Sequence, residues 1–246
     1  MTDAPRIRFY FSFRSPFAAI AFHRLRRAPQ FNDLTIELMP VWPKIIFGGH
    51  MDNPTDNYFK LAYIFGDAAR QAELAGMSAA PFQRLAARIQ LPQDVDYRRE
   101  KVGVKMPDER WEIPHAALLF AERQGRAWAF GEAVFVRRFG LDDHAAADVQ
   151  DPEVIAQLAD AMGLDGAAAA RAHESAEFAE RMQRVVADGE RDGVFGVPFF
   201  VLERDGGREA FWGNDRLEHV LRALTGTREL PVIDAATLTE VQPARL

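Results

Sequence analysis

Two proline-containing segments at opposite ends of the chain carry the residue types best suited to chemistry. Ser15-Pro16 follows an alternating apolar run, and serine followed by proline is typical of a helix start. The free N–H groups and positive dipole end of such a start lower the pKa of a nearby thiol. Val197-Pro198 lies inside the glycine-flanked segment Gly193–Val201, directly before an apolar run. We predict that the two segments form one site, with Ser15 facing the proline.

The thiol in such a site would have to come from outside, because the chain contains no cysteine. Dithiol chemistry, a disulfide framework and a thiolate metal site are therefore excluded. A serine hydroxyl is a poor nucleophile without an adjacent base, and no Ser/His/Asp spacing indicates one. We interpret Ser15 as the activator of a bound thiol, the alternative being a serine that only caps a helix. The six histidines lack metal-ligand spacing, so we predict no metal site.

The elements that position these segments are predicted at the two ends of the chain. Alternating apolar residues predict strands near 7–12 and 34–38, with a helix from Pro16 to about Ala28 between them. Two further strands, at 199–203 and 209–211, are separated by Asp205-Gly206-Gly207, a good hairpin turn. A last helix is predicted over 214–224. Strands from both ends must pair to bury their apolar faces.

The middle of the chain has helical periodicity. We predict helices over 56–75, 79–90, 108–124, 128–139, 151–161 and 175–192. This block is therefore an insertion into a domain made of residues 1–45 and 190–226, with the insertion covering 46–189. Residues 227–246 are predicted to be a loosely attached C-terminal extension.

Composition limits the class of protein. The chain has 246 residues, 48% of them hydrophobic, and a formal net charge of -6. An acidic chain of this kind does not favour nucleic acid as a partner. No apolar run is long enough to span a bilayer, and no signal-peptide pattern opens the chain. We expect a cytoplasmic protein with no membrane partner.

Several motifs, taken in order, resemble one group of known proteins. They are 11–18 (Phe-Ser-Phe-Arg-Ser-Pro-Phe-Ala), 60–63 (Lys-Leu-Ala-Tyr) with Asp67 and Arg70, 193–198 (Gly-Val-Phe-Gly-Val-Pro) and 211–217 (Phe-Trp-Gly-Asn-Asp-Arg-Leu). Between about Arg6 and Leu224 the chain resembles the 2-hydroxychromene-2-carboxylate isomerases and kappa-class glutathione transferases. The resemblance implies an α/β, thioredoxin-like (DsbA-like) fold with a large all-helical insertion. Ser15 stands where related proteins have a nucleophilic cysteine.

The resemblance implies a glutathione-dependent cis-trans isomerase acting on a small aromatic keto acid, as a homodimer. Ser15 is then the catalytic residue and donates its hydroxyl hydrogen to the glutathione sulfur. Val197-Pro198 is implied to be cis, with the Val197 backbone pairing with glutathione like an added strand. The alternative is a trans proline that simply begins a strand. Aromatic residues in the inserted block could line the substrate pocket or belong to the core: Phe47, Phe59, Tyr63, Phe65, Trp111 and Trp128.

The remaining glutathione contacts are implied at four residues. Asn214 and Asp215 would hold the γ-glutamyl end, or they simply cap the last helix. Lys60 would bind the glycyl carboxylate or the substrate carboxylate, or it lies on a solvated helix face. Asn53 is a further contact, for which Asn57 could substitute.

Two other functions are compatible with these residues. A kappa-like glutathione transferase would use the same activated thiol but consume glutathione. A non-catalytic thioredoxin-like module would use Val197-Pro198 to hold an extended peptide.

Overall fold

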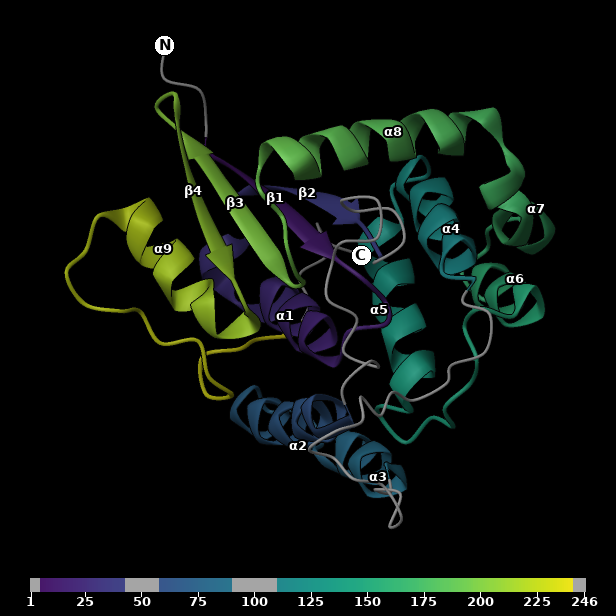
Figure 1. Cartoon of the computed structure of the whole chain (residues 1–246), viewed down its shortest axis with the longest axis horizontal. Coiled ribbons are helices and arrows are strands. Elements are labelled where there is room, and N and C mark those ends of the chain that lie inside the picture. Colours follow the sequence, from purple (N-terminus) through teal and green to yellow (C-terminus); the bar gives the residue numbers. More distant parts are fainter. Residues whose placement is uncertain (1–4, 43–57, 90–109, 241–246) are drawn as a thin grey trace, which may run out of the picture.

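One mixed sheet joins the two ends of the chain (Figure 1). The computed structural model describes residues 5–42, 58–89 and 110–240. Its strands are β1 (Arg6–Phe11), β2 (Thr35–Pro40), β3 (Phe199–Arg204) and β4 (Gly207–Trp212), in the order β2-β1-β3-β4. β1 runs parallel to β2 and antiparallel to β3, and β4 is antiparallel to β3. The predicted pairing of the chain ends is confirmed.

Strand β1 presents two chemically different faces because its side chains alternate. Phe9 and Phe11 are buried on one face, where both contact Phe22 of helix α1 (Pro16–Arg27). Phe9 also stacks on Phe200 of β3, with ring centroids 5.1 Å apart. The opposite face carries Arg8 and Tyr10, which contact the end of the helical block.

Within the ranges that the structure describes, the central block contains helices and no strand, as predicted. Its α-helices are α2 (Tyr58–Leu74), α3 (Ala80–Arg88), α4 (Glu112–Glu122), α5 (Ala127–Phe139), α6 (Pro152–Asp160), α7 (Gly166–Arg171) and α8 (Ala176–Arg191). Asp151 and Ser175 cap α6 and α8 as the sequence indicates. The short helix α7, which the sequence did not predict as a separate element, begins at the capping residue Asp165.

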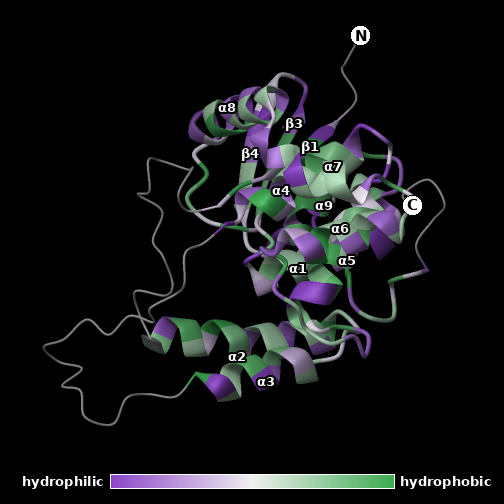
Figure 2. Cartoon of the chain, turned by 90° about the vertical axis from the view of Figure 1, so that its right-hand side faces the viewer, coloured by the Kyte–Doolittle hydropathy of each residue, from purple (hydrophilic) through white to green (hydrophobic). Residues whose placement is uncertain are grey.

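Different helices pack on the two faces of the sheet. Helix α8 crosses the face of the sheet that carries Arg8 and Tyr10, while α1 and α5 pack on the Phe9 and Phe11 face. Figure 2 shows α2 and α3 side by side at one end of the molecule. The sheet is thus enclosed between elements of both chain halves.

The hairpin between β3 and β4 and the last helix follow the sequence closely. Arg204 pairs with Gly207, so the turn contains only Asp205 and Gly206, both with positive φ as a type I′ turn requires. After β4, a short 3-10 helix η5 (Asn214–Arg216) leads into α9 (Leu217–Thr225).

The segment after α9 is attached to the body, so the prediction of a loose extension is wrong for residues 227–240. Ile233 is buried, and its carbonyl accepts a hydrogen bond from Arg24 at 2.7 Å. The Ala235 N–H donates to the Leu74 carbonyl, and the Thr239 N–H donates to the Arg27 carbonyl. These backbone contacts fix the segment against α1 and α2.

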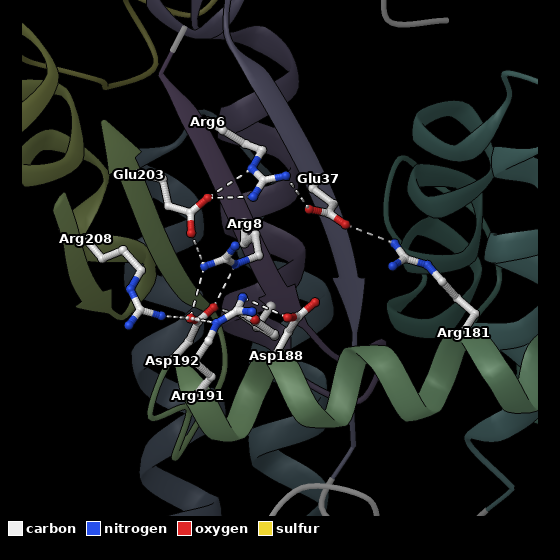
Figure 3. Close-up of polar contacts among 10 residues, drawn as sticks. Arg6, Arg8, Glu37, Arg181, Asp188, Arg191, Asp192, Glu203 and Arg208 are labelled. Atoms are coloured by element: carbon white, nitrogen blue, oxygen red, sulfur yellow. Dashed lines mark hydrogen bonds and ion pairs between the residues drawn. The ribbon is translucent and has the colours of Figure 1, made fainter. Parts of the chain in front are cut away.

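A buried ionic cluster fastens the helical block to the sheet (Figure 3). The Asp192 side chain, just after α8, is fully buried and accepts two hydrogen bonds from Arg8, at 2.7 and 3.0 Å. It also accepts hydrogen bonds from the Tyr10 hydroxyl at 2.7 Å and from Arg208 of β4 at 3.0 Å. Burial alone raises the pKa of Asp192, but the bonds from Tyr10 and Arg8 lower it overall. One carboxylate therefore joins α8, β1 and β4.

Replacing this carboxylate should destabilise the fold strongly. We expect Asp192→Asn to lower the free energy of unfolding by about 3 kcal/mol, because it leaves the buried Arg8 charge without its main partner. Asp188→Asn is the control, since Asp188 pairs at 2.7 Å with the half-exposed Arg191, and it should cost under about 1 kcal/mol. Urea denaturation of both variants measures the difference. Equal losses would contradict the anchoring role of Asp192.

Candidate active site

Ser15 is the N-cap of α1, as predicted. Its Oγ accepts a hydrogen bond from the Ala18 N–H at 3.2 Å, and Pro16 occupies the first helical position. Because the Oγ acts as an acceptor in this bond, its hydroxyl hydrogen can be donated to a ligand. The side chain is partly exposed, so a ligand can approach it.

The helix start offers a second donor that sequence analysis did not identify. Pro16 has no N–H, the Ala18 N–H is used by Ser15, and the Ala19 N–H donates to the Ser15 carbonyl at 3.2 Å. Within the described ranges the Phe17 N–H has no hydrogen-bond acceptor. The Phe17 N–H and the Ser15 hydroxyl are therefore the two groups able to stabilise an anion at this terminus.

The loop from β1 to α1 is held by internal hydrogen bonds and by one histidine. The Ser15 N–H donates to the Ser12 carbonyl at 3.0 Å, and the Arg14 N–H donates to Ser12 Oγ at 3.3 Å. The Phe13 N–H donates to Nε2 of His115 on α4 at 3.3 Å. Sequence patterns carry no signal for this contact, because it joins residues 102 positions apart.

Val197-Pro198 is a cis peptide bond, as the resemblance implied. Val197 is partly buried, and neither its backbone N–H nor its C=O has a hydrogen-bond partner in the part of the chain that the structure describes. Tyr10 pairs with Phe199, so the end of β1 that leads to Ser15 and the beginning of β3 lie at the same edge of the sheet. Sheet topology thus brings both predicted segments to one place.

Asn214 and Asp215 are brought next to the cis-proline. The Gly213 N–H donates to the Pro198 carbonyl at 2.9 Å, which ties the start of η5 to the proline. Asn214 is buried, and its backbone carbonyl accepts a hydrogen bond from Arg24 of α1 at 2.7 Å. Asp215 is half-exposed and pairs with Arg216 at 3.3 Å. Asp215 is therefore accessible to a ligand, whereas the Asn214 side chain faces inward toward Arg24.

The other predicted contacts lie elsewhere or outside the described ranges. Lys60 is in the first turn of α2 with an exposed side chain, and its role stays a prediction. Asn53 and its substitute Asn57 fall outside the described residues. Asp67 and Arg70, which belong to the same motif as Lys60, form an ion pair at 3.0 Å.

The candidate pocket aromatics divide into two groups. Trp111 is fully buried, and Trp128 and Phe65 are partly buried against the core. Phe59 and Tyr63 are exposed on α2, and Phe47 is outside the described ranges. A different pair stands beside the cis-proline: Phe195 and Trp212 are both exposed and lie 4.9 Å apart, centroid to centroid.

A cavity of about 730 Å³ lies at the tip of the β3–β4 hairpin, away from the predicted site residues. Four arginines line it (Arg6, Arg191, Arg204 and Arg208), and each already contacts a protein carboxylate or carbonyl. The edge with Ser15 and Val197 therefore stays the candidate site. Among the described residues no cluster of three His, Asp or Glu side chains could hold a metal ion. No helix in the same ranges is long and apolar enough to cross a membrane.

Comparison with known proteins shows the family to which the chain belongs. The family model of the DSBA-like thioredoxin domain matches residues 6–225, and the chain belongs to that family. It is 27% identical over 212 residues to the 2-hydroxychromene-2-carboxylate isomerase of Pseudomonas putida, covering 85% of this chain and 89% of the relative. The protein of that name from Sphingobium xenophagum is 25% identical over 215 residues, 86% of this chain and 94% of the relative.

Solved structures show the same fold. A 2-hydroxychromene-2-carboxylate isomerase structure superposes with a TM-score of 0.60 at 23% identity, covering 90% of this chain and 94% of the other. The cytosolic disulfide reductase DsbM from Pseudomonas aeruginosa, solved with GSH, has a TM-score of 0.55 at 20% identity. The match with DsbM covers 91% of this chain and 98% of DsbM.

The buried His115 should make stability depend on pH. Burial lowers the pKa of His115 to about 3, against the opposing hydrogen bond to the Trp111 carbonyl. The unfolded chain, with an ordinary histidine pKa of 6.5, takes up protons as pH falls below that value, while the folded chain does not. The contribution of His115 to the free energy of unfolding is therefore fully present above pH 6.5 and declines as the pH falls toward 3. His23, whose pKa burial also lowers to about 3, acts in the same direction.

We expect the stability gap between wild type and His115→Gln to narrow as pH falls from 6.5 to 4.5. The change should be about 1.4 kcal/mol per pH unit, because glutamine does not titrate. Chemical denaturation at several pH values measures this gap, and shared contributions from carboxylates cancel in the difference. A gap that stays constant over this range would show that His115 titrates normally in the fold.

Proposed function

We propose that the protein is a glutathione-dependent isomerase that interconverts cis and trans forms of an aromatic keto acid. The observation that carries the proposal is the arrangement at one sheet edge of a serine-capped helix start and a cis-proline, in a chain without cysteine. The residue before this proline, Val197, has no backbone hydrogen-bond partner among the described residues. Glutathione would supply the thiolate that adds to a conjugated double bond, allows rotation about the resulting single bond, and leaves.

The chain's own residues hold and orient the thiolate in this proposal. The Ser15 hydroxyl and the Phe17 N–H donate to the sulfur, which lowers the pKa of the thiol. The free N–H and C=O of Val197 pair with the cysteinyl part of glutathione. Asp215, exposed beside Pro198, pairs with the γ-glutamyl ammonium, and the backbone near Asn214 holds its carboxylate. Lys60 and Asn53 are proposed carboxylate contacts.

The comparisons support this choice of activity. Curated relatives at 25–27% identity bear the name 2-hydroxychromene-2-carboxylate isomerase, and DsbM, of similar fold, was solved with GSH. The proposal includes a homodimer and a cytoplasmic location, the latter matching the cytosolic description of DsbM. A kappa-like transferase would use the same site, and net consumption of glutathione during turnover distinguishes it from the isomerase.

One observation favours a second candidate function. The unpaired Val197 backbone lies beside the exposed aromatic pair Phe195 and Trp212. An extended peptide could add to such a backbone and place an apolar side chain on the aromatic pair. Binding of unfolded peptides without binding of glutathione would select this function.

Ser15→Ala tests the proposed chemistry. The lost cap should cost about 1 kcal/mol of stability. The pKa of bound glutathione should rise and turnover should slow about 100-fold, well beyond the effect of the stability change. Thiolate absorbance in the ultraviolet, followed against pH, reports the ionisation.

Ser175→Ala is the matched control. Ser175 caps α8 by accepting from the Phe178 N–H at 3.1 Å, so its loss removes an equivalent cap away from the site. This variant should lose similar stability and leave the thiol pKa unchanged. If bound glutathione ionises identically in wild type and Ser15→Ala, Ser15 is only a cap and the proposed mechanism is wrong.

A further inference from the structure

His115 is a fully buried polar side chain that the proposed reaction does not use. It lies on α4, inside the helical block, and both ring nitrogens have partners. Nδ1 is 2.5 Å from the Trp111 carbonyl oxygen, one turn earlier on the same helix. Nε2 is 3.3 Å from the Phe13 nitrogen, in the loop that ends at Ser15.

These two contacts fix the state of the imidazole. The Trp111 carbonyl can only accept, so Nδ1 carries the proton, and Nε2 accepts from the Phe13 N–H. The ring packs among Phe11, Phe13, Trp42 and Trp111, and no charged side chain contacts it among the described residues. The nearby guanidinium of Arg138 lies over the Trp111 ring. A neutral imidazole with one fixed tautomer is therefore a rigid acceptor.

The loop that His115 contacts is partly held by its own hydrogen bonds. The N–H groups of Arg14 and Ser15 both donate to Ser12 within the loop. Phe13 contacts the helical block. The centroid of its ring lies 5.0 Å from that of His115 and 4.8 Å from that of Phe135. Phe13 and its acceptor therefore connect the Ser12–Ser15 turn to the helical block.

We infer that His115 is a positioning residue for the helix start: through the Phe13 N–H it fixes the loop that places the Ser15 side chain and the Phe17 N–H at the site. Through His115 on α4, the inserted helical block thereby helps to fix the position of the hydrogen-bond donors at the helix start. The effect of His115 on catalysis rests on the proposed function. Its effect on the position of the helix start does not depend on glutathione.

The experiment uses this independence from glutathione. Ser15→Cys introduces a single thiol into a chain that has none, at the position where the helix terminus should depress its pKa. The rate of alkylation by iodoacetamide against pH gives that pKa without glutathione. It is measured in Ser15→Cys alone and combined with His115→Gln, His115→Phe or His115→Asn.

The three replacements separate the acceptor from the packing. Glutamine can place an acceptor near Nε2, phenylalanine keeps the ring but accepts nothing, and asparagine can donate to Trp111 but is too short to reach Phe13. Ile155→Ala, in the buried face of α6, is the control for lost stability. If His115→Phe fails to fold, His115→Asn carries the test.

We expect a depressed pKa of the introduced thiol in the Ser15→Cys parent, in the His115→Gln combination and in the Ile155→Ala control. In the His115→Phe and His115→Asn combinations the thiol pKa should return toward about 8.5, the ordinary value for cysteine. In the wild-type Ser15 background the same two variants should lower kcat about 10- to 100-fold, whereas His115→Gln should keep kcat near the wild-type value.

An unchanged thiol pKa in the His115→Phe or His115→Asn combination, at a loss of thermal stability like that of the control, overturns the inference. Failure of wild type to bind glutathione overturns the proposed function only.

Discussion

The structure depends on one pairing, between β1 near the beginning of the chain and β3 near its end. Both strands carry apolar side chains that are buried in the core, and neither can bury them alone, so the sheet closes only when the chain ends meet. The register that pairs Tyr10 with Phe199 places the exit of β1 beside the entry to β3. Ser15 follows the first and Val197 precedes the second, so the candidate site is a direct consequence of this pairing.

The helical block is held to this sheet by polar contacts as well as by packing. Asp192 receives Arg8 and Tyr10 from β1 and Arg208 from β4, which fixes the end of α8 on one face of the sheet. On the other side of β1, His115 receives the Phe13 N–H, which fixes α4 against the loop to α1. The polar atoms of the Asp192 and His115 side chains have partners, so these contacts specify one arrangement of insertion and sheet.

Much of the fold was predictable because its signals are local. Alternation around Phe9, the Ser15-Pro16 helix start and the Asp205-Gly206 turn all depend on neighbouring residues, and the structure confirms them. The contacts to His115 and Arg24 were not predictable, because each links residues about 100 or more positions apart and neither has a characteristic spacing. The same reason explains the wrong prediction for the tail, where Ile233 is buried by elements that are distant in sequence.

We propose that glutathione binds at the edge where Ser15, Val197 and Asp215 are placed. Calorimetric titration of the wild-type protein with reduced glutathione measures this binding. We expect saturable binding to one site per chain, weakened in Asp215→Ala, whose half-exposed side chain can be removed without disturbing the core. If titration of the folded protein to millimolar glutathione gives no saturable heat, glutathione does not bind at this edge and the proposed site is wrong.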